Sequence, residues 1–134
     1  MEVALQGESF TEGEKGKDKF EIDGLLVARE SKIVLVVEAK KSLREYHVEQ
    51  VLSTARNTTL YWDKVVLRSA TVVLPKIEEC ELIHVLVAPY AAPQILAAIA
   101  NHDDKFVVIT ESGDNFGILY CSAGLQGLAR SSPM

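Results

Sequence analysis

The fold of this chain is decided by residues 20–40, which run FEIDGLLVARESKIVLVVEAK. Two apolar segments, Phe20–Val27 and Ile33–Lys40, are rich in Val, Ile and Leu, and the polar residues Arg29–Lys32 lie between them. Short apolar segments of this composition on either side of a polar break are typical of two strands in an antiparallel hairpin.

Three charged residues interrupt these strands: Asp23 in the first, and Glu38 and Lys40 in the second. Isolated ionised groups are costly to bury, so such residues need a compensating partner such as a metal ion. A turn of even length centred on Glu30 and Ser31 pairs Asp23 with Glu38 across the hairpin, and Lys40 lies on the same face two residues further on. A turn of odd length would move Asp23 to the other face. The even register predicts a catalytic site built from Asp23, Glu38 and Lys40.

Two facing carboxylates about 5 Å apart repel each other, so without a cation one of them is expected to take up a proton. A divalent ion resolves this conflict, because hard cations prefer carboxylate, carbonyl and water oxygens. We therefore expect Mg2+ as the cofactor, with Mn2+ as the alternative.

This pattern resembles the PD-(D/E)XK nuclease superfamily, which has the restriction-endonuclease-like fold. An Asp is followed, after fourteen residues, by Glu38-Ala39-Lys40 on the next strand. The resemblance covers roughly residues 20–57 and implies that Asp23, Glu38 and the backbone carbonyl of Ala39 bind the metal. It implies that Lys40 orients or activates water. The implied fold is an α/β domain with a mixed central sheet and flanking helices.

The resemblance extends to the segment after Lys40. Many members carry a Gln on the following helix, and Gln50 matches it as a supporting residue, although a polar residue on a helix flank is equally compatible with simple solvation. Lys41 and Arg44 belong to a basic cluster that we expect to contact nucleic acid. Ile22 stands where the superfamily name has Pro, a change that removes no ligand.

The beginning of the chain departs from the superfamily pattern. Members usually open with a helix, but the nineteen residues before Phe20 contain three glycines and favour a short strand and a charged loop. We expect a single nuclease-like domain over residues 1–134 that lacks this helix. The structural alternative is a pair of edge strands with solvated charges. The unbroken apolar run Ile33–Val37 argues against it, because such runs are typical of strands covered on both faces.

The remaining chain alternates between helical and extended patterns. Ser42 as N-cap with Glu45 in a capping box predicts a helix to about Asn57, or further through Trp62. The pattern of Val65–Leu74 does not decide its type. Three further strands and one helix are predicted: Leu82–Val87, Pro93–Ala100 (the helix), Phe106–Thr110 and Phe116–Cys121.

Composition sets the outer limits of the function. The chain has 134 residues with 48% hydrophobic, which suits one domain with a sizeable core. There is no apolar run near eighteen residues and no basic-then-apolar leader, so we expect an intracellular protein of cytoplasm or nucleus with no membrane association. Cys80 and Cys121 lack the spacing of a zinc site. The net charge of -5 opposes binding to a phosphate backbone, but local basic patches matter more than the sum.

The sequence thus predicts a metal-dependent nuclease that hydrolyses phosphodiester bonds of DNA or RNA, as an endonuclease or an exonuclease. The alternative is a catalytically inactive nuclease-like module that binds protein or nucleic acid. The oligomeric state stays open; many members act as dimers to cut two strands, so a homodimer is among the arrangements that the resemblance implies.

Overall fold

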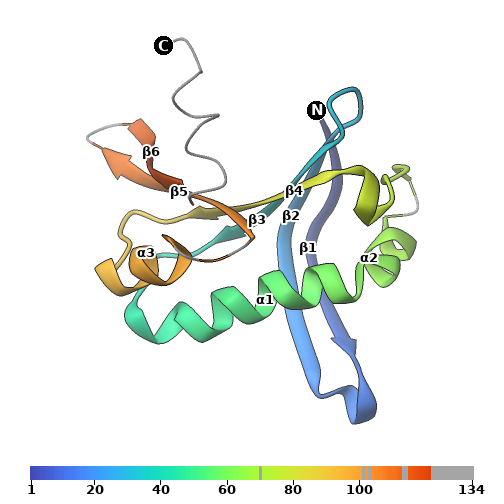
Figure 1. Cartoon of the computed structure of the whole chain (residues 1–134), viewed down its shortest axis with the longest axis horizontal. Coiled ribbons are helices and arrows are strands. Elements are labelled where there is room, and N and C mark those ends of the chain that lie inside the picture. Colours follow the sequence, from blue (N-terminus) through green and yellow to red (C-terminus); the bar gives the residue numbers. More distant parts are fainter. Residues whose placement is uncertain (70, 101, 103, 113–114, 122–134) are drawn as a thin grey trace.

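A computed structural model of the chain describes residues 1–69, 71–100, 102, 104–112 and 115–121, with side chains up to residue 111. In this part of the chain, six strands form one mixed sheet in the order β1-β2-β3-β4-β5-β6 (Figure 1). Their bounds are β1 Glu2–Glu12, β2 Asp18–Ala28, β3 Ile33–Ala39, β4 Glu81–Val87, β5 Lys105–Ser112 and β6 Asn115–Cys121. The predicted α/β class with a mixed sheet is confirmed.

Strand direction follows from the connections. The pairs β1–β2, β2–β3 and β5–β6 are antiparallel. The pairs β3–β4 and β4–β5 are parallel. Parallel neighbours need a crossover, usually a helix, and here α1 (Val48–Leu60) and α2 (Trp62–Arg68) supply the first crossover and α3 (Pro93–Ala100) the second.

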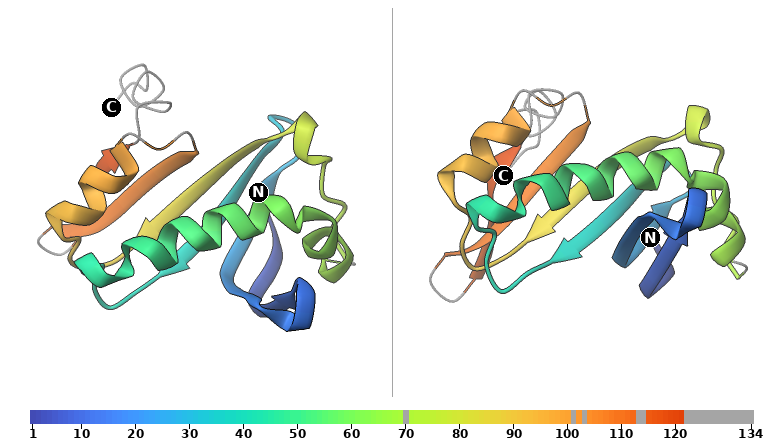
Figure 2. Two further views of the ribbon diagram at one scale, coloured as in Figure 1. Left: turned by 60° about the horizontal axis from the view of Figure 1, so that its bottom comes forward. Right: turned by 90° about the horizontal axis from the view of Figure 1, so that it is seen from below.

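These three helices pack on one face of the sheet. Figure 2 shows α1 running along this face, with α3 near one of its ends and α2 near the other. Successive side chains of a strand point to opposite faces, so Val34 and Val36 of β3 are buried beneath the helices. On the opposite face, Ile33, Leu35 and Val37 are only partly buried. Among the described residues, the prediction that both faces of β3 are covered is therefore correct for the face under the helices and wrong for the opposite face.

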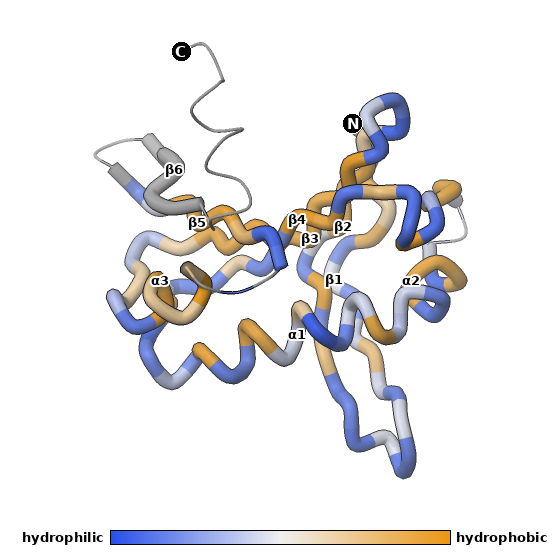
Figure 3. Tube along the Cα trace, in the orientation of Figure 1, coloured by the Kyte–Doolittle hydropathy of each residue, from blue (hydrophilic) through white to orange (hydrophobic). Residues whose placement is uncertain are grey.

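Hydrophobic residues concentrate in the central strands β3 and β4, whereas the turn between β1 and β2 is hydrophilic (Figure 3). Strand β1 fills the place where the sequence predicts a short strand and a charged loop, but it spans eleven residues. It is anchored by the buried rings of Phe10 and Phe20, which stack with centroids 4.9 Å apart. The predicted strands β4, β5 and β6 and the helix α3 are confirmed. No helix in the described residues has the length and apolar character needed to cross a membrane.

The predicted start of the first helix is wrong. Ser42 is not its N-cap, because Leu43 is extended and forms a parallel bridge with Ala91. The Leu43 N–H donates to the Tyr90 carbonyl at 2.8 Å, and the Leu43 side chain is fully buried. A 3-10 turn over Glu45–His47 follows, and α1 begins at Val48. Burial of Leu43 and its pairing with a distant segment outweigh the local capping pattern.

The segment from residue 65 to 74, whose secondary structure the sequence does not decide, begins as a helix and continues as an irregular segment. Helix α2 ends at Arg68, and residues 72 and 74 have no regular structure. The side chain of Trp62 is buried and its indole N–H donates to the Pro75 carbonyl at 3.1 Å, which holds the irregular segment against α2.

Candidate active site

Strand β2 separates from β3 where the predicted site begins. Their ladder runs from Ala28 paired with Ile33 to Gly24 paired with Val37. This is the register predicted from an even turn, and it makes Asp23 and Glu38 the next facing positions. Beyond the ladder, the Ala39 N–H donates to Asp23 Oδ2 at 2.8 Å. The Asp23 side chain thus replaces a backbone acceptor at the point where the β1–β2 hairpin leaves the sheet and extends past α1 (Figure 1).

Four of the predicted residues meet in one small hollow of about 100 Å3. Asp23 comes from β2, Glu38 from β3, Lys40 from the residue after β3, and Gln50 from α1. The hollow is also lined by Lys19, Phe20, Glu21, Ser53 and Thr54. Lys41 and Arg44 do not line it; Lys41 is exposed and Arg44 lines a separate hollow beside Tyr90.

Glu38 and Lys40, which both line this hollow, form an ion pair. Glu38 Oε1 lies 3.7 Å from Lys40 Nζ, and the two side chains are 12% and 27% exposed. Burial raises the pKa of the Glu38 carboxyl above 4.5; the Lys40 ammonium opposes this, while the negative charges of Asp23 and Glu21 add to it. Burial is the main cause of this shift and repulsion by Asp23 is a smaller one, so the pKa of Glu38 moves in the direction that two facing carboxylates predict.

The backbone of Ala39 faces the same side as Asp23. The Lys40 N–H donates to the Val87 carbonyl of β4 at 2.9 Å. In a planar trans peptide the carbonyl points opposite to the N–H of the next residue. The Ala39 carbonyl is therefore directed away from β4 and toward the side of β2, where the Asp23 carboxylate lies.

These donors suit a hard cation. Two carboxylates and one carbonyl offer only oxygen, and Mg2+ commonly binds through one or two carboxylates while it keeps several waters. A carboxylate has about four lone-pair positions, so the hydrogen bond from Ala39 leaves Asp23 able to bind an ion. No group of three or more His, Cys, Asp and Glu side chains that could hold a metal occurs in the described part of the chain. An ion held here would thus complete its shell with water.

Sequence reasoning missed Glu21, Ser53 and Thr54, although periodicity would have found them. Glu21 precedes Asp23 by two residues on a strand and so shares its face. Ser53 and Thr54 follow Gln50 by three and four residues on α1, the spacing of neighbours on one helix face. Each adds a polar group to the same hollow.

His84 lies next to this site in the core. It is 4% exposed on β4, pairs with Val36 of β3, and its ring is 5.1 Å from that of Phe106. Burial lowers its pKa to about 4. The imidazole is therefore neutral at physiological pH.

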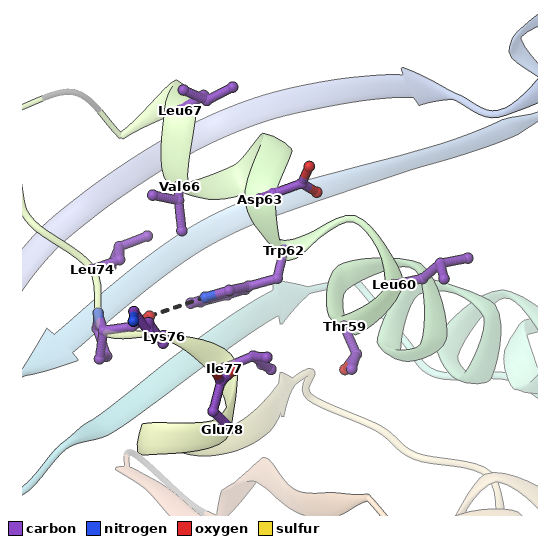
Figure 4. Close-up of a pocket in the computed structure, with 11 residues that line it drawn as sticks. Thr59, Leu60, Trp62, Asp63, Val66, Leu67, Leu74, Lys76, Ile77 and Glu78 are labelled. Carbon is purple, nitrogen blue, oxygen red and sulfur yellow. Dashed lines mark hydrogen bonds between the residues drawn. The ribbon is translucent and has the colours of Figure 1, made fainter.

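A much larger hollow, of about 570 Å3, lies between α2 and residues 74–78 (Figure 4). Its walls are mainly apolar side chains, among them Trp62, Val66, Leu74 and Ile77. Asp63, Lys76 and Glu78 also line it. In the smaller hollow Glu38 and Lys40 form an ion pair beside Asp23, so this contact rather than size marks the candidate active site.

Comparison with known proteins assigns no family: no protein-family model, no curated protein and no solved structure matches this chain.

Proposed function

We propose that this protein is a metal-dependent nuclease that hydrolyses phosphodiester bonds of DNA or RNA and has a restriction-endonuclease-like fold. The observation that carries the proposal is the shared hollow, in which Asp23, Glu38, Lys40 and Gln50 meet. Their arrangement resembles that of the PD-(D/E)XK superfamily. An antiparallel hairpin, a helix and a strand parallel to the second hairpin strand follow one another, as β2, β3, α1 and β4.

Asp23, Glu38 and the Ala39 carbonyl would hold Mg2+ or Mn2+. When bound, such an ion polarises the phosphate and lowers the pKa of a coordinated water. The hydrogen bond from Ala39 fixes the Asp23 carboxylate before any ligand arrives. A preorganised group loses little freedom on binding, so the hydrogen bond favours the reactive geometry.

Lys40 is the group of this chain that would act on the reacting atoms. Its ammonium projects into the hollow beside Glu38, where it can orient the attacking water and stabilise negative charge that develops on the phosphate oxygens. Water adds to phosphorus as the bond to the leaving oxygen breaks, and the leaving oxygen departs with a proton. Gln50 faces the same hollow from α1 as a positioning residue.

The side chains that line the hollow include three carboxylates, Glu21, Asp23 and Glu38, against two lysines, so a bound divalent cation would be needed to make the local charge positive and offset the net charge of -5. Lys19 and Lys40 line the hollow, and Lys41 follows on the exposed surface. Phosphate affinity depends on the charges near the contact, since more distant charges are screened.

The test is cleavage of labelled single- and double-stranded DNA and RNA with Mg2+ or Mn2+, with EDTA as control. We expect cutting of at least one substrate that EDTA abolishes. Binding of Mn2+ is measured by calorimetry in parallel, because it is independent of turnover. A folded protein that binds no Mn2+ and cuts none of the four substrates would contradict the proposal.

The second candidate function is a catalytically inactive nuclease-like module that binds protein or nucleic acid. The apolar hollow beside α2 favours it, because Leu60 and Leu67 stand largely exposed along its rim (Figure 4). Exposed apolar patches often mark interaction sites. Binding of nucleic acid or protein without cleavage, by a folded protein, would select this function.

A further inference from the structure

Two tyrosines stand exposed near the candidate active site. Tyr46 is 76% exposed and belongs to the 3-10 turn before α1, and Tyr90 is 44% exposed in the loop after β4. The bridge between Leu43 and Ala91 holds the two segments side by side. Both tyrosines line one open hollow of about 400 Å3. This volume falls in the range of small-molecule sites.

One cationic side chain, that of Arg44, and one imidazole ring, that of His47, lie against these tyrosines. The guanidinium carbon of Arg44 lies 4.4 Å from the centre of the Tyr90 ring, a cation–π contact, and Arg44 Nε donates to Ser42 Oγ at 3.2 Å. The ring of His47 lies 4.3 Å from that of Tyr46. A guanidinium over an aromatic ring still offers N–H donors to a phosphate, and guanidinium groups also stack on planar groups. Glu45 is the one acidic residue that lines this hollow in the described part of the chain.

The hollow is close to the candidate active site along the chain. Lys40 lines the active site, and Arg44 follows four residues later; four residues of extended chain span at most about 14 Å. Tyr46 precedes Gln50 by four residues, roughly one helical turn. A nucleotide whose base lies against the tyrosines is therefore only a few nucleotides from a phosphate at Asp23 and Glu38.

We infer that Tyr46, Tyr90 and Arg44 form a stacking site for unpaired nucleobases, so the substrate is a single strand or a single-stranded end. The inference rests on the proposed nuclease function and names its substrate class. Proteins that bind single strands combine a basic groove with aromatic side chains on which bases stack. Bases inside a duplex have both faces covered by their neighbours, so only unpaired bases can use exposed tyrosine rings in this way.

The test is fluorescence anisotropy with labelled single-stranded DNA, single-stranded RNA and a blunt DNA duplex, all in EDTA so that no cleavage occurs. We expect the wild type to prefer single strands. Tyr46→Ala should weaken single-strand binding about tenfold and leave duplex binding unchanged within about twofold. Tyr46→Trp should restore the affinity. The DNA and RNA arms show which nucleic acid is bound.

Val73→Ala is the control, since Val73 is 79% exposed in the segment after α2 and lines none of the hollows described above. It should change neither affinity. Equal binding of duplex and single strands, or normal single-strand affinity in both Tyr46→Ala and Tyr90→Ala, would overturn the inference.

The same proteins are then assayed for cleavage with Mg2+. Cleavage of the duplex with unchanged rate in Tyr46→Ala would overturn the inference and leave the nuclease standing. Single-strand binding that is weakened in Tyr46→Ala, without cleavage of any substrate, would support the stacking site and contradict the nuclease.

Discussion

The Asp23 carboxylate accepts a hydrogen bond of 2.8 Å from the backbone N–H of Ala39. This bond lies where the β2–β3 ladder ends, so one side chain both ties the two strands together and faces the hollow shared with Glu38 and Lys40. The structural and ligand roles of Asp23 can therefore be separated by substitution.

Asp23→Asn keeps an acceptor oxygen for the Ala39 N–H but removes the negative charge. We expect stability close to the wild type and Mn2+ affinity at least about tenfold weaker, because ligand charge sets the affinity of hard cations. Asp23→Ala also loses the hydrogen bond, which should lower the free energy of unfolding by about 1 kcal/mol more. Calorimetric titration and urea unfolding measure the two effects. Unchanged Mn2+ affinity in Asp23→Asn would rule this residue out as a ligand.

Metal binding should depend on pH through Glu38. Burial raises the pKa of its carboxyl above 4.5, so a proton competes with the cation below that raised pKa. Mn2+ affinity should fall by up to about tenfold for each unit of pH below it and level off above it. For the same reason the native state holds this proton more tightly than the unfolded chain, so the contribution of Glu38 to stability falls as pH rises from 4.5 through the raised pKa.

Glu38→Gln is the comparison that isolates this titration. The variant should bind Mn2+ weakly at every pH. Its free energy of unfolding should increase relative to that of the wild type as pH rises, because only the wild type loses the contribution of protonated Glu38. A difference that stays constant across this range would show that Glu38 does not titrate with a raised pKa.

His84 should make stability depend on pH in the opposite sense. Its pKa is lowered by burial from 6.5 to about 4, with Asp104 opposing and His102 adding to this shift. Between these values the unfolded chain binds a proton that the native state does not. The unfolding free energy should therefore decrease as pH falls from 6.5 to 4, by up to about 3 kcal/mol.

Urea unfolding of the wild type and of His84→Gln across this range measures the effect. The variant should lose this part of the pH slope, even though its stability at neutral pH also changes. Parallel slopes in the two proteins would show that the imidazole does not titrate as its burial indicates.

The hairpin could be predicted from sequence because its information is local. An even turn and apolar segments of matched length define one pairing, and the pair Gly24 and Val37 lies in that register. Alternation along β2 would also have indicated Glu21, which shares the face of Asp23. These positions depend on residues adjacent in the chain.

The start of α1 and the tyrosine surface could not be predicted in this way. Leu43 is extended because it pairs with Ala91, a contact between segments far apart in the chain. The same pairing brings Arg44 over the Tyr90 ring. Local capping patterns carry no information about such contacts. The partial exposure of Leu35 likewise depends on which face of the sheet the helices cover.

The central claim is tested most directly by cleavage of labelled nucleic acid by Lys40→Ala. Lys64→Ala is the control, since it removes an exposed lysine of α2 outside the candidate site. Wild type and Lys64→Ala should cut with Mg2+ and stop in EDTA, and Lys40→Ala should cut at least about a hundredfold more slowly while it stays folded. Cleavage by Lys40→Ala at the wild-type rate would contradict the account.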